Sequence, residues 1–191
     1  MENERGRALR IGLCGPKAGG KTSLASRLIG EPVSDPSPTI GVDFYSKSIP
    51  DTKLKLDFWD LAGGEQYMYI TDSYIKKLDL LLYVYDATDE FQQKELESLY
   101  QCYQEKGVTK KAIIVGTHSD LQKESYTETA ESIAKKGGHP HLLVSTKTGS
   151  NLDILSQRIL GYHRGLTVPR VRVTTVRKTG AKKQPTGCTI A

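Results

Sequence analysis

The sequence predicts an α/β protein, in which helices cover both faces of a mostly parallel, six-stranded sheet with one antiparallel edge strand. Three observations lead to this fold class. Short apolar runs of buried-strand length recur between residues 8 and 146, helical patterns separate the later runs, and two runs of period-two alternation flank a Pro-Asp-Thr turn. One hairpin followed by strand–helix repeats is typical of a parallel sheet with an antiparallel edge.

The expected elements follow in order along the chain. A buried strand at 8–14 precedes a helix at 21–29, and three prolines then keep the next segment, 32–38, in an irregular loop. The hairpin follows, with strands at 42–49 and 53–60. Further strands are expected at 80–87, 111–117 and 141–146, and further helices at about 90–106, 127–136 and 150–163.

The charge is distributed unevenly between the body and the end of the chain. Of 27 basic residues, seven lie in 164–191, a stretch that holds none of the 22 acidic residues. The remaining 20 bases give the body a net charge of −2, although the whole chain carries +5. The hydrophobic period also disappears from Gly165 onward. We therefore expect one domain over 1–164 and a flexible basic tail over 165–191, which would meet an anionic surface.

Several classes of protein are disfavoured by the composition. The three cysteines have no paired spacing, which suggests neither a disulfide framework nor a zinc site and fits a reducing compartment. The charged start lacks a secretory signal, and no apolar run reaches the roughly 20 residues that a spanning helix needs.

A glycine-rich loop stands between the first strand and the first helix. Its sequence, GPKAGGKT at 15–22, fits the phosphate-binding pattern G-x-x-x-x-G-K-[ST] in the strand–loop–helix context that the pattern requires. Gly15, Gly19 and Gly20 allow the backbone to wrap closely around a phosphate. Lys21 would neutralise the β- and γ-phosphates, and Thr22 would bind Mg²⁺. The alternative is a glycine-rich turn capped by Thr22.

Two later segments add to this hypothesis. Asp60, in WDLAGGE (59–65), lies at a predicted strand end, where a second Mg²⁺-binding group belongs, and Gly63 would offer its backbone N–H to a γ-phosphate. Asp120, in VGTHSDL (115–121), has a carboxylate that can accept from both N–H groups of guanine, which adenine lacks. Taken alone, the first segment is also consistent with a loose turn and Asp120 with an ordinary exposed acid.

Together these residues resemble a small GTPase of the Ras superfamily, and the Rab branch in particular, over about 8–163. The resemblance is carried, in the family's order, by GPKAGGKT, PTIGVDF (38–44), WDLAGGE, THSD (117–120) and STK (145–147). It implies the P-loop NTPase fold of small G proteins, and a protein that binds GTP or GDP with Mg²⁺. It also implies a membrane-anchored molecular switch in vesicle traffic or signalling, with GTP hydrolysis to GDP and phosphate.

The resemblance also implies the residues of the site. Mg²⁺ would be held by Thr22, Thr39 and Asp60, and hydrolysis would depend on Lys21, Thr39 and position 64. Loss of the γ-phosphate would release the 32–45 loop and the 61–75 segment. The expected nucleotide-binding residues are Gly15, Lys17, Ala18, Gly19, Gly20, Lys21, Thr22, Ser23, Thr39, Gly63, Thr117, His118, Asp120, Ser145, Thr146 and Lys147.

Four positions depart from the family's pattern. Gly64 replaces the glutamine that orients the attacking water, so we expect slow intrinsic hydrolysis. Lys17 replaces a small residue, and it would stabilise transition-state charge, block a supplied arginine or point to solvent. Thr117 and His118 replace the usual Asn and Lys, so we expect weaker nucleotide binding that still favours guanine.

The remaining expectations concern partners. Phe44, Trp59 and Tyr74 match the aromatic trio that Rab proteins present to effectors, although aromatic residues serve equally in cores. The chain ends in Cys188-Thr-Ile-Ala, the pattern for prenylation, and the basic tail would supply the second membrane signal. The protein would then be anchored at the cytoplasmic face of a membrane, and cytosolic when unprenylated.

The protein is expected to act with regulators, and two alternative functions are considered. An exchange factor, a GTPase-activating protein and effectors are expected without being identified. Nucleic-acid binding is not expected, because the tail has no aromatic residue for base stacking, and the protein is expected to be a monomer. The main alternative is a hydrolysis-deficient, GTP-loaded membrane scaffold that recruits effectors. A P-loop small-molecule kinase is disfavoured by PTIGVDF and THSD.

Overall fold

The computed structural model describes residues 8–33, 37–108, 110–121 and 126–163. The strands are β1 (Leu9–Cys14), β2 (Val42–Ser48), β3 (Lys55–Leu61), β4 (Leu80–Asp86), β5 (Lys111–Thr117) and β6 (His141–Leu143). The helices are α1 (Lys21–Ile29), α2 (Met68–Ile75), α3 (Glu90–Glu105), α4 (Glu128–Gly137) and α5 (Leu152–Gly161), and a single 3₁₀ turn, η1 (Glu65–Tyr67), precedes α2.

The strands form one six-stranded sheet in the order β2-β3-β1-β4-β5-β6. Only β2 runs antiparallel to its neighbour, with Phe44 opposite Trp59 in the β2–β3 hairpin. The other four pairings are parallel. The predicted fold class, including the antiparallel edge strand, is therefore confirmed.

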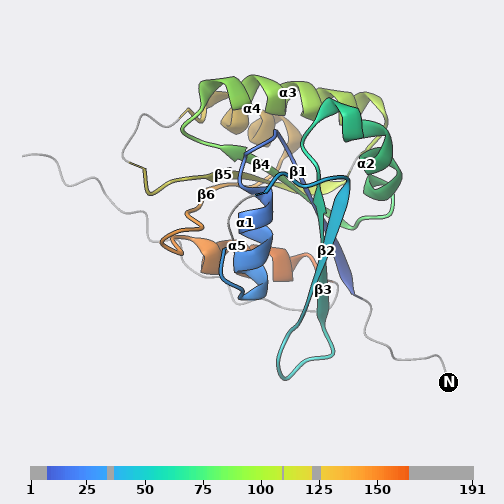
Figure 1. The fold of residues 1–191 in the computed structure, drawn as a ribbon, viewed down its shortest axis with the longest axis vertical. Helices are drawn as coiled ribbons and strands as arrows, with labels where there is room; N and C mark the ends of the chain where they lie inside the picture. The colour runs from blue at the N-terminus through green and yellow to red at the C-terminus, as the bar shows by residue number, and fades with distance from the viewer. Residues whose placement is uncertain (1–7, 34–36, 109, 122–125, 164–191) are drawn as a thin grey trace, which may run out of the picture.

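Helices cover both faces of this sheet (Figure 1). Helices α1 and α5 lie on one face, while α2, α3 and α4 lie on the other. Since β4 has helices on both sides, six of its seven residues are buried and its sequence LLLYVYD shows no alternation.

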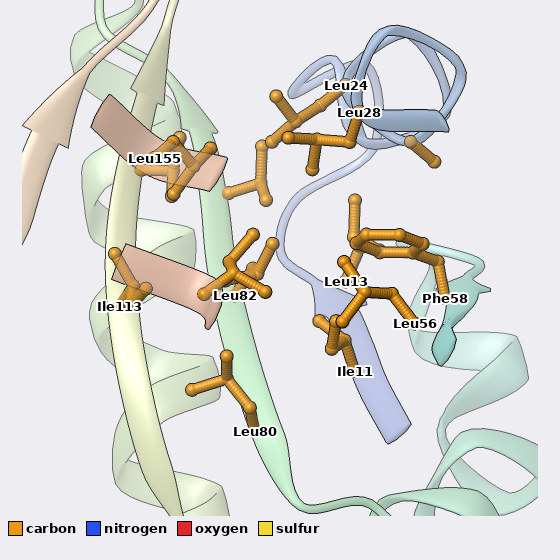
Figure 2. Close-up of a cluster of buried hydrophobic side chains, with 14 of the residues drawn as sticks. Ile11, Leu13, Leu24, Leu28, Leu56, Phe58, Leu80, Leu82, Ile113 and Leu155 are labelled. Carbon is orange, nitrogen blue, oxygen red and sulfur yellow. The ribbon is translucent and has the colours of Figure 1, made fainter. Parts of the chain in front are cut away.

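Buried side chains from four strands, most of them aliphatic, fill the space between the sheet and helices α1 and α5 (Figure 2). Leu24 and Leu28 of α1 belong to the same buried cluster as Leu13 and Phe58, and all four side chains are almost completely buried. This packing fixes the start of α1 relative to the ends of β1 and β3, and so fixes the loop between β1 and α1.

The clearest differences from the prediction are one missed helix and two shorter elements. Helix α2 was missed, because MYITDSYI is rich in β-branched and aromatic residues and buries only Thr71 and Ile75. Strand β6 stops at Leu143 rather than 146, because the chain turns at Ser145, whose N–H donates to the carbonyl of Ser150. Helix α5 accordingly begins at Leu152 and ends at Gly161, inside the predicted 150–163.

No helix in the described part of the chain is both long and apolar enough to cross a membrane. Cys14 and Cys102 are free thiols. The predicted tail and Cys188 lie outside the described residues.

Candidate functional site

The loop between β1 and α1 is shaped to bind an anion. Gly15 has φ +148°, and a Cβ there would overlap the carbonyl oxygen of Val84, so only glycine fits. Helix α1 starts without a side-chain cap and without an acidic residue in its first turn. Its first N–H groups and the positive end of its dipole therefore remain available to a phosphate.

Lys21, the first residue of α1, is buried beneath this loop. Its ammonium donates to the carbonyl oxygens of Gly15 (2.9 Å) and Pro16 (2.6 Å), which leaves one of its three protons for a ligand. Burial lowers the pKa of Lys21, although the charge of Asp60 opposes this. A bound phosphate would offset this desolvation by supplying negative charge.

The turn after β3 packs directly against the loop. A Cβ on Gly63 would lie 2.5 Å from Lys21 Nζ, 2.6 Å from the Gly15 oxygen and 2.7 Å from the Lys17 nitrogen. Position 63 therefore requires glycine, and its backbone lies beside the ammonium that would meet the phosphates.

Three oxygen-bearing side chains converge next to Lys21. Thr22 Oγ1 donates to Asp60 Oδ2 (2.5 Å), Thr39 Oγ1 donates to the same oxygen (3.2 Å), and the two hydroxyls lie 3.0 Å apart. Asp60 is fully buried, and among the described residues its Oδ1 has no hydrogen-bond partner. Burial raises the pKa of Asp60, against the hydrogen bond from Thr22 and the charge of Lys21.

This cluster has the chemistry of a magnesium site. Hydroxyl protons that point to Asp60 leave oxygen lone pairs for a cation, and the unpartnered carboxylate oxygen is a further acceptor. Mg²⁺ prefers such oxygen ligands and usually takes others from substrate phosphates and water. The described residues hold no cluster of three or more His, Cys, Asp or Glu side chains suited to a metal.

A cavity of about 430 Å³ joins these parts. Its walls come from the β1–α1 loop, the segment before β2, the turn after β3 and the end of β5. The lining residues are Lys17, Ala18, Gly19, Gly20, Lys21, Thr22, Ser23, Ser37, Pro38, Thr39, Ile40, Gly63, Gly64, Gln66, Tyr67 and His118. The structure therefore brings most of the predicted nucleotide-binding residues to one cavity.

The end of β5 is tied to the β1–α1 loop through Thr117. This residue is fully buried, and its hydroxyl is within donating distance of the carbonyl oxygens of Gly19 (3.0 Å) and Tyr85 (3.1 Å). The next residue, His118, has φ +58°, and its Nδ1 lies 3.0 Å from both Thr117 Oγ1 and Asp86 Oδ2. Left-handed backbone at a non-glycine residue is uncommon and tends to occur at ligand sites.

Asp120, after β5, is held by Ser145, which follows the neighbouring strand β6. Ser145 Oγ donates to Asp120 Oδ1 (2.6 Å), and Ser145 in turn accepts from the N–H of Thr148 (3.0 Å). The hydrogen bond from Ser145 is the main cause that lowers the pKa of Asp120, and Lys147 contributes through its charge. An ionised carboxylate in this place is suited to accept two N–H groups from a base.

The predicted residues at 145–147 do not line the cavity itself. Ser145 contacts the site through its hydrogen bond to Asp120. The exposed Lys147 acts on the site through its charge, which helps to lower the pKa of Asp120. For Thr146 the structure gives no contact with the other site residues.

The aromatic trio forms one cluster on the β2–β3 side. The Phe44 and Trp59 rings are 4.9 Å apart, and Trp59 and Tyr74 are 5.2 Å apart. Phe44 is 50% exposed, whereas Trp59 and Tyr74 are partly buried and also pack against the core. Both readings of the trio, surface contact and core, are compatible with this arrangement.

Three site residues were not predicted. Gln92 of α3 is buried and donates to the carbonyl oxygen of Lys17 (3.3 Å) while accepting from the N–H of Asp86 (3.0 Å). Asp86 pairs with His118, and Gln66 lines the cavity. For Gln92, a glutamine on the buried face of a predicted helix was the only indication in the sequence. Asp86 and Gln66 join the site through contacts that the sequence does not indicate.

Comparisons with known proteins find relatives of this chain. The family model described as the Ras family matches residues 10–161. Ras-related protein Rab-42 of Mus musculus is 32% identical over 157 residues, which cover 76% of this chain and 72% of that protein. Ras-related protein SEC4 of Saccharomyces cerevisiae is 31% identical over 151 residues, covering 76% and 70%. Ras-related protein Rab-2B of Dictyostelium discoideum is 31% identical over 147 residues, covering 74% and 73%.

Proposed function

Since this chain belongs to the Ras family and resembles its Rab-named members, we propose that it binds GTP and GDP with Mg²⁺ and acts as a membrane-anchored switch. The observation that carries this proposal is the convergence of Lys21, Thr22, Thr39 and Asp60 at one end of the cavity. Vesicle traffic, which is the setting of Rab proteins, is its proposed cellular role.

Each part of the nucleotide has a proposed set of contacts. The loop 15–20 and Lys21 bind the phosphates, because α1 begins without a side-chain cap and the Lys21 ammonium keeps one proton for a ligand. Asp120, oriented by Ser145, binds the guanine edge, and Thr117 holds the loop at the right distance from β5. Thr146 and Lys147 would close over the base.

Mg²⁺ would be held by the hydroxyl oxygens of Thr22 and Thr39, whose protons are donated to Asp60. When bound, the ion would neutralise charge on the β- and γ-phosphates. Thr39 precedes β2, and Gly63 follows β3, so both predicted switch segments reach the same phosphate position. Loss of the γ-phosphate would remove the contacts that hold 37–45 and 61–75 in place.

The guanine assignment is tested by the nucleotide that the purified protein carries. Mass spectrometry should detect GDP or GTP, and excess GTP should displace a labelled nucleotide far better than excess ATP. Asp120→Asn should weaken GDP binding roughly 10- to 150-fold, because one acceptor becomes a donor where a charged hydrogen bond is worth about 1.5–3 kcal/mol. The matched control is Asp51→Asn, an exposed aspartate in the β2–β3 turn. Equal displacement by ATP and GTP would disprove the assignment.

The switch is tested by hydrogen exchange over 37–45 and 61–75. These segments should exchange more slowly with a non-hydrolysable GTP analogue than with GDP. Identical exchange in both states would contradict the switch and leave a nucleotide-loaded scaffold, the function that the bare Gly64 favours as a second candidate.

Membrane anchoring rests on the Cys188 motif and the seven basic residues of 164–191. The prenylated protein should sediment with vesicles that contain anionic lipid, and Cys188→Ser should remain in the supernatant. Equal sedimentation of both proteins would contradict the lipid anchor.

A further inference from the structure

The side chain of Gln66 occupies the space above Gly64. A Cβ on Gly64 would lie 2.7 Å from Gln66 Oε1, 3.0 Å from its Cδ and 3.1 Å from its Nε2. The turn η1 produces this approach, because the N–H of Tyr67 donates to the carbonyl of Gly64 (2.9 Å) and folds residue 66 back over residue 64. A carboxamide therefore stands where a side chain at position 64 would begin.

Gln66 also belongs to the wall of the cavity in which the phosphates are proposed to bind. Gln66 lines the cavity together with Lys17, Gly63 and Thr39. Gly63, one residue before Gly64, packs against the ammonium of Lys21. In the described part of the chain no hydrogen bond engages the Gln66 carboxamide, and the side chain is exposed, so both its oxygen and its N–H groups are available to a ligand.

We propose that Gln66 supplies the carboxamide that orients the attacking water during GTP hydrolysis, in place of the side chain that Gly64 lacks. This inference rests on the proposed GTPase function. The Gln66 Oε1 would accept a hydrogen bond from the water, and Nε2 would donate to an oxygen of the γ-phosphate. The water oxygen forms a bond to the γ-phosphorus as the bond from that phosphorus to the β–γ bridging oxygen breaks. The bridging oxygen keeps the bonding electron pair and leaves as part of GDP. One water proton passes to a γ-phosphoryl oxygen, and the other stays on the attacking oxygen, so both end on the inorganic phosphate.

Hydrolysis is then expected to be slow but real. The carboxamide is carried by the exposed Gln66, two residues further along the chain, so it is less firmly positioned than one carried by residue 64 itself. Slow GTP hydrolysis that depends on Gln66 would therefore distinguish a switch from a hydrolysis-deficient scaffold.

The test is single-turnover hydrolysis of GTP by the full chain with Mg²⁺, with GTP and GDP affinities measured separately. Gln66→Ala should lower the hydrolysis rate about tenfold or more, with affinities unchanged within about twofold. Gln101→Ala, on an exposed glutamine of α3, is the matched control and should hydrolyse at the wild-type rate.

Two changes at position 64 make the test specific. Gly64→Ala should slow hydrolysis as much as Gln66→Ala, because the new methyl displaces the flexible end of the Gln66 side chain without moving backbone. The double variant Gly64→Ala/Gln66→Ala should be no slower than either single variant, since both remove the same interaction. Gly64→Gln/Gln66→Ala should restore hydrolysis.

Each other outcome counts against the inference. If Gln66→Ala hydrolyses GTP at the wild-type rate, the inference is wrong. It is also wrong if the wild-type protein hydrolyses GTP no faster than buffer does, although nucleotide binding and the proposed scaffold would then survive. Failure to bind guanine nucleotide, seen in the affinity measurement alone, would overturn the proposed function and this inference with it.

Discussion

Replacing Thr117 with valine should destabilise the protein and loosen its nucleotide site together. Thr117 is fully buried, and its hydroxyl stands between the carbonyl oxygens of Gly19 and Tyr85 at 3.0 and 3.1 Å. It also lies 3.0 Å from His118 Nδ1. Valine has almost the same volume but provides no donor, so Thr117→Val removes the link between the phosphate loop and β5 without creating a cavity.

The magnitude follows from the groups left behind. The Thr117 hydroxyl has one proton and can donate to only one of the two carbonyl oxygens at a time. The valine variant therefore removes one hydrogen bond, next to a buried residue, Gly19. An unsatisfied buried acceptor costs about 1–3 kcal/mol. The additional cost of a cavity, which brings truncations such as Leu→Ala to about 2–5 kcal/mol, does not arise here. We therefore expect a loss of about 1–3 kcal/mol in the free energy of unfolding.

Urea unfolding with saturating GDP and Mg²⁺ measures this loss. With a slope of about 2 kcal/mol per molar urea, the midpoint should fall by about 0.5–1.5 M while the slope stays unchanged. GDP should also dissociate faster, and repeating the measurement at a second GDP concentration separates weaker binding from a weaker fold. Thr117→Ser keeps the hydroxyl and should stay closer to wild type. A valine variant within about 0.5 kcal/mol of wild type, with unchanged GDP dissociation, would refute the reasoning.

Three further changes test other parts of the structure. Asp60→Asn should make GDP release fast and insensitive to EDTA, because it weakens the magnesium cluster; wild-type-like acceleration by EDTA in the variant would argue against this cluster as the metal site. Gly63→Ala should lower the melting temperature by roughly 2–8 °C, since its Cβ would stand 2.6 Å from the Gly15 oxygen; an unchanged melting temperature would show that the turn relaxes freely. Burial lowers the pKa of His139 and His141, so the unfolded chain binds more protons and the free energy of unfolding should fall as pH drops below about 6.5. In pH-dependent denaturation His141→Gln should flatten this fall, and an equal fall in the variant would exclude His141 as a source.

The amino-acid sequence alone predicted the sheet, its antiparallel edge and most helix positions. This was possible because apolar runs such as LLLYVYD and the period-two hairpin report local geometry and burial directly. The strand–loop–helix context of the glycine-rich segment 15–22 was equally predictable, because its pattern typically follows a strand and begins a helix. The Ras-superfamily resemblance, confirmed by the family match over 10–161, came from the order of several such segments.

Only the tertiary structure decided which side chains act on one another. The pairing of His118 with Asp86, the support of Asp120 by Ser145 and the convergence of Thr39 with Asp60 join residues that are 21 to 32 positions apart. Helix α2 was not predicted either, because its sequence has weak helical preference and its two buried side chains, Thr71 and Ile75, gain their packing only in the folded sheet. Gln66 was not predicted as a site residue, and only η1 places its carboxamide over Gly64. Local sequence specifies backbone preference and burial, whereas the chemistry of a site depends on distances of about 3 Å between groups that only a complete fold brings together.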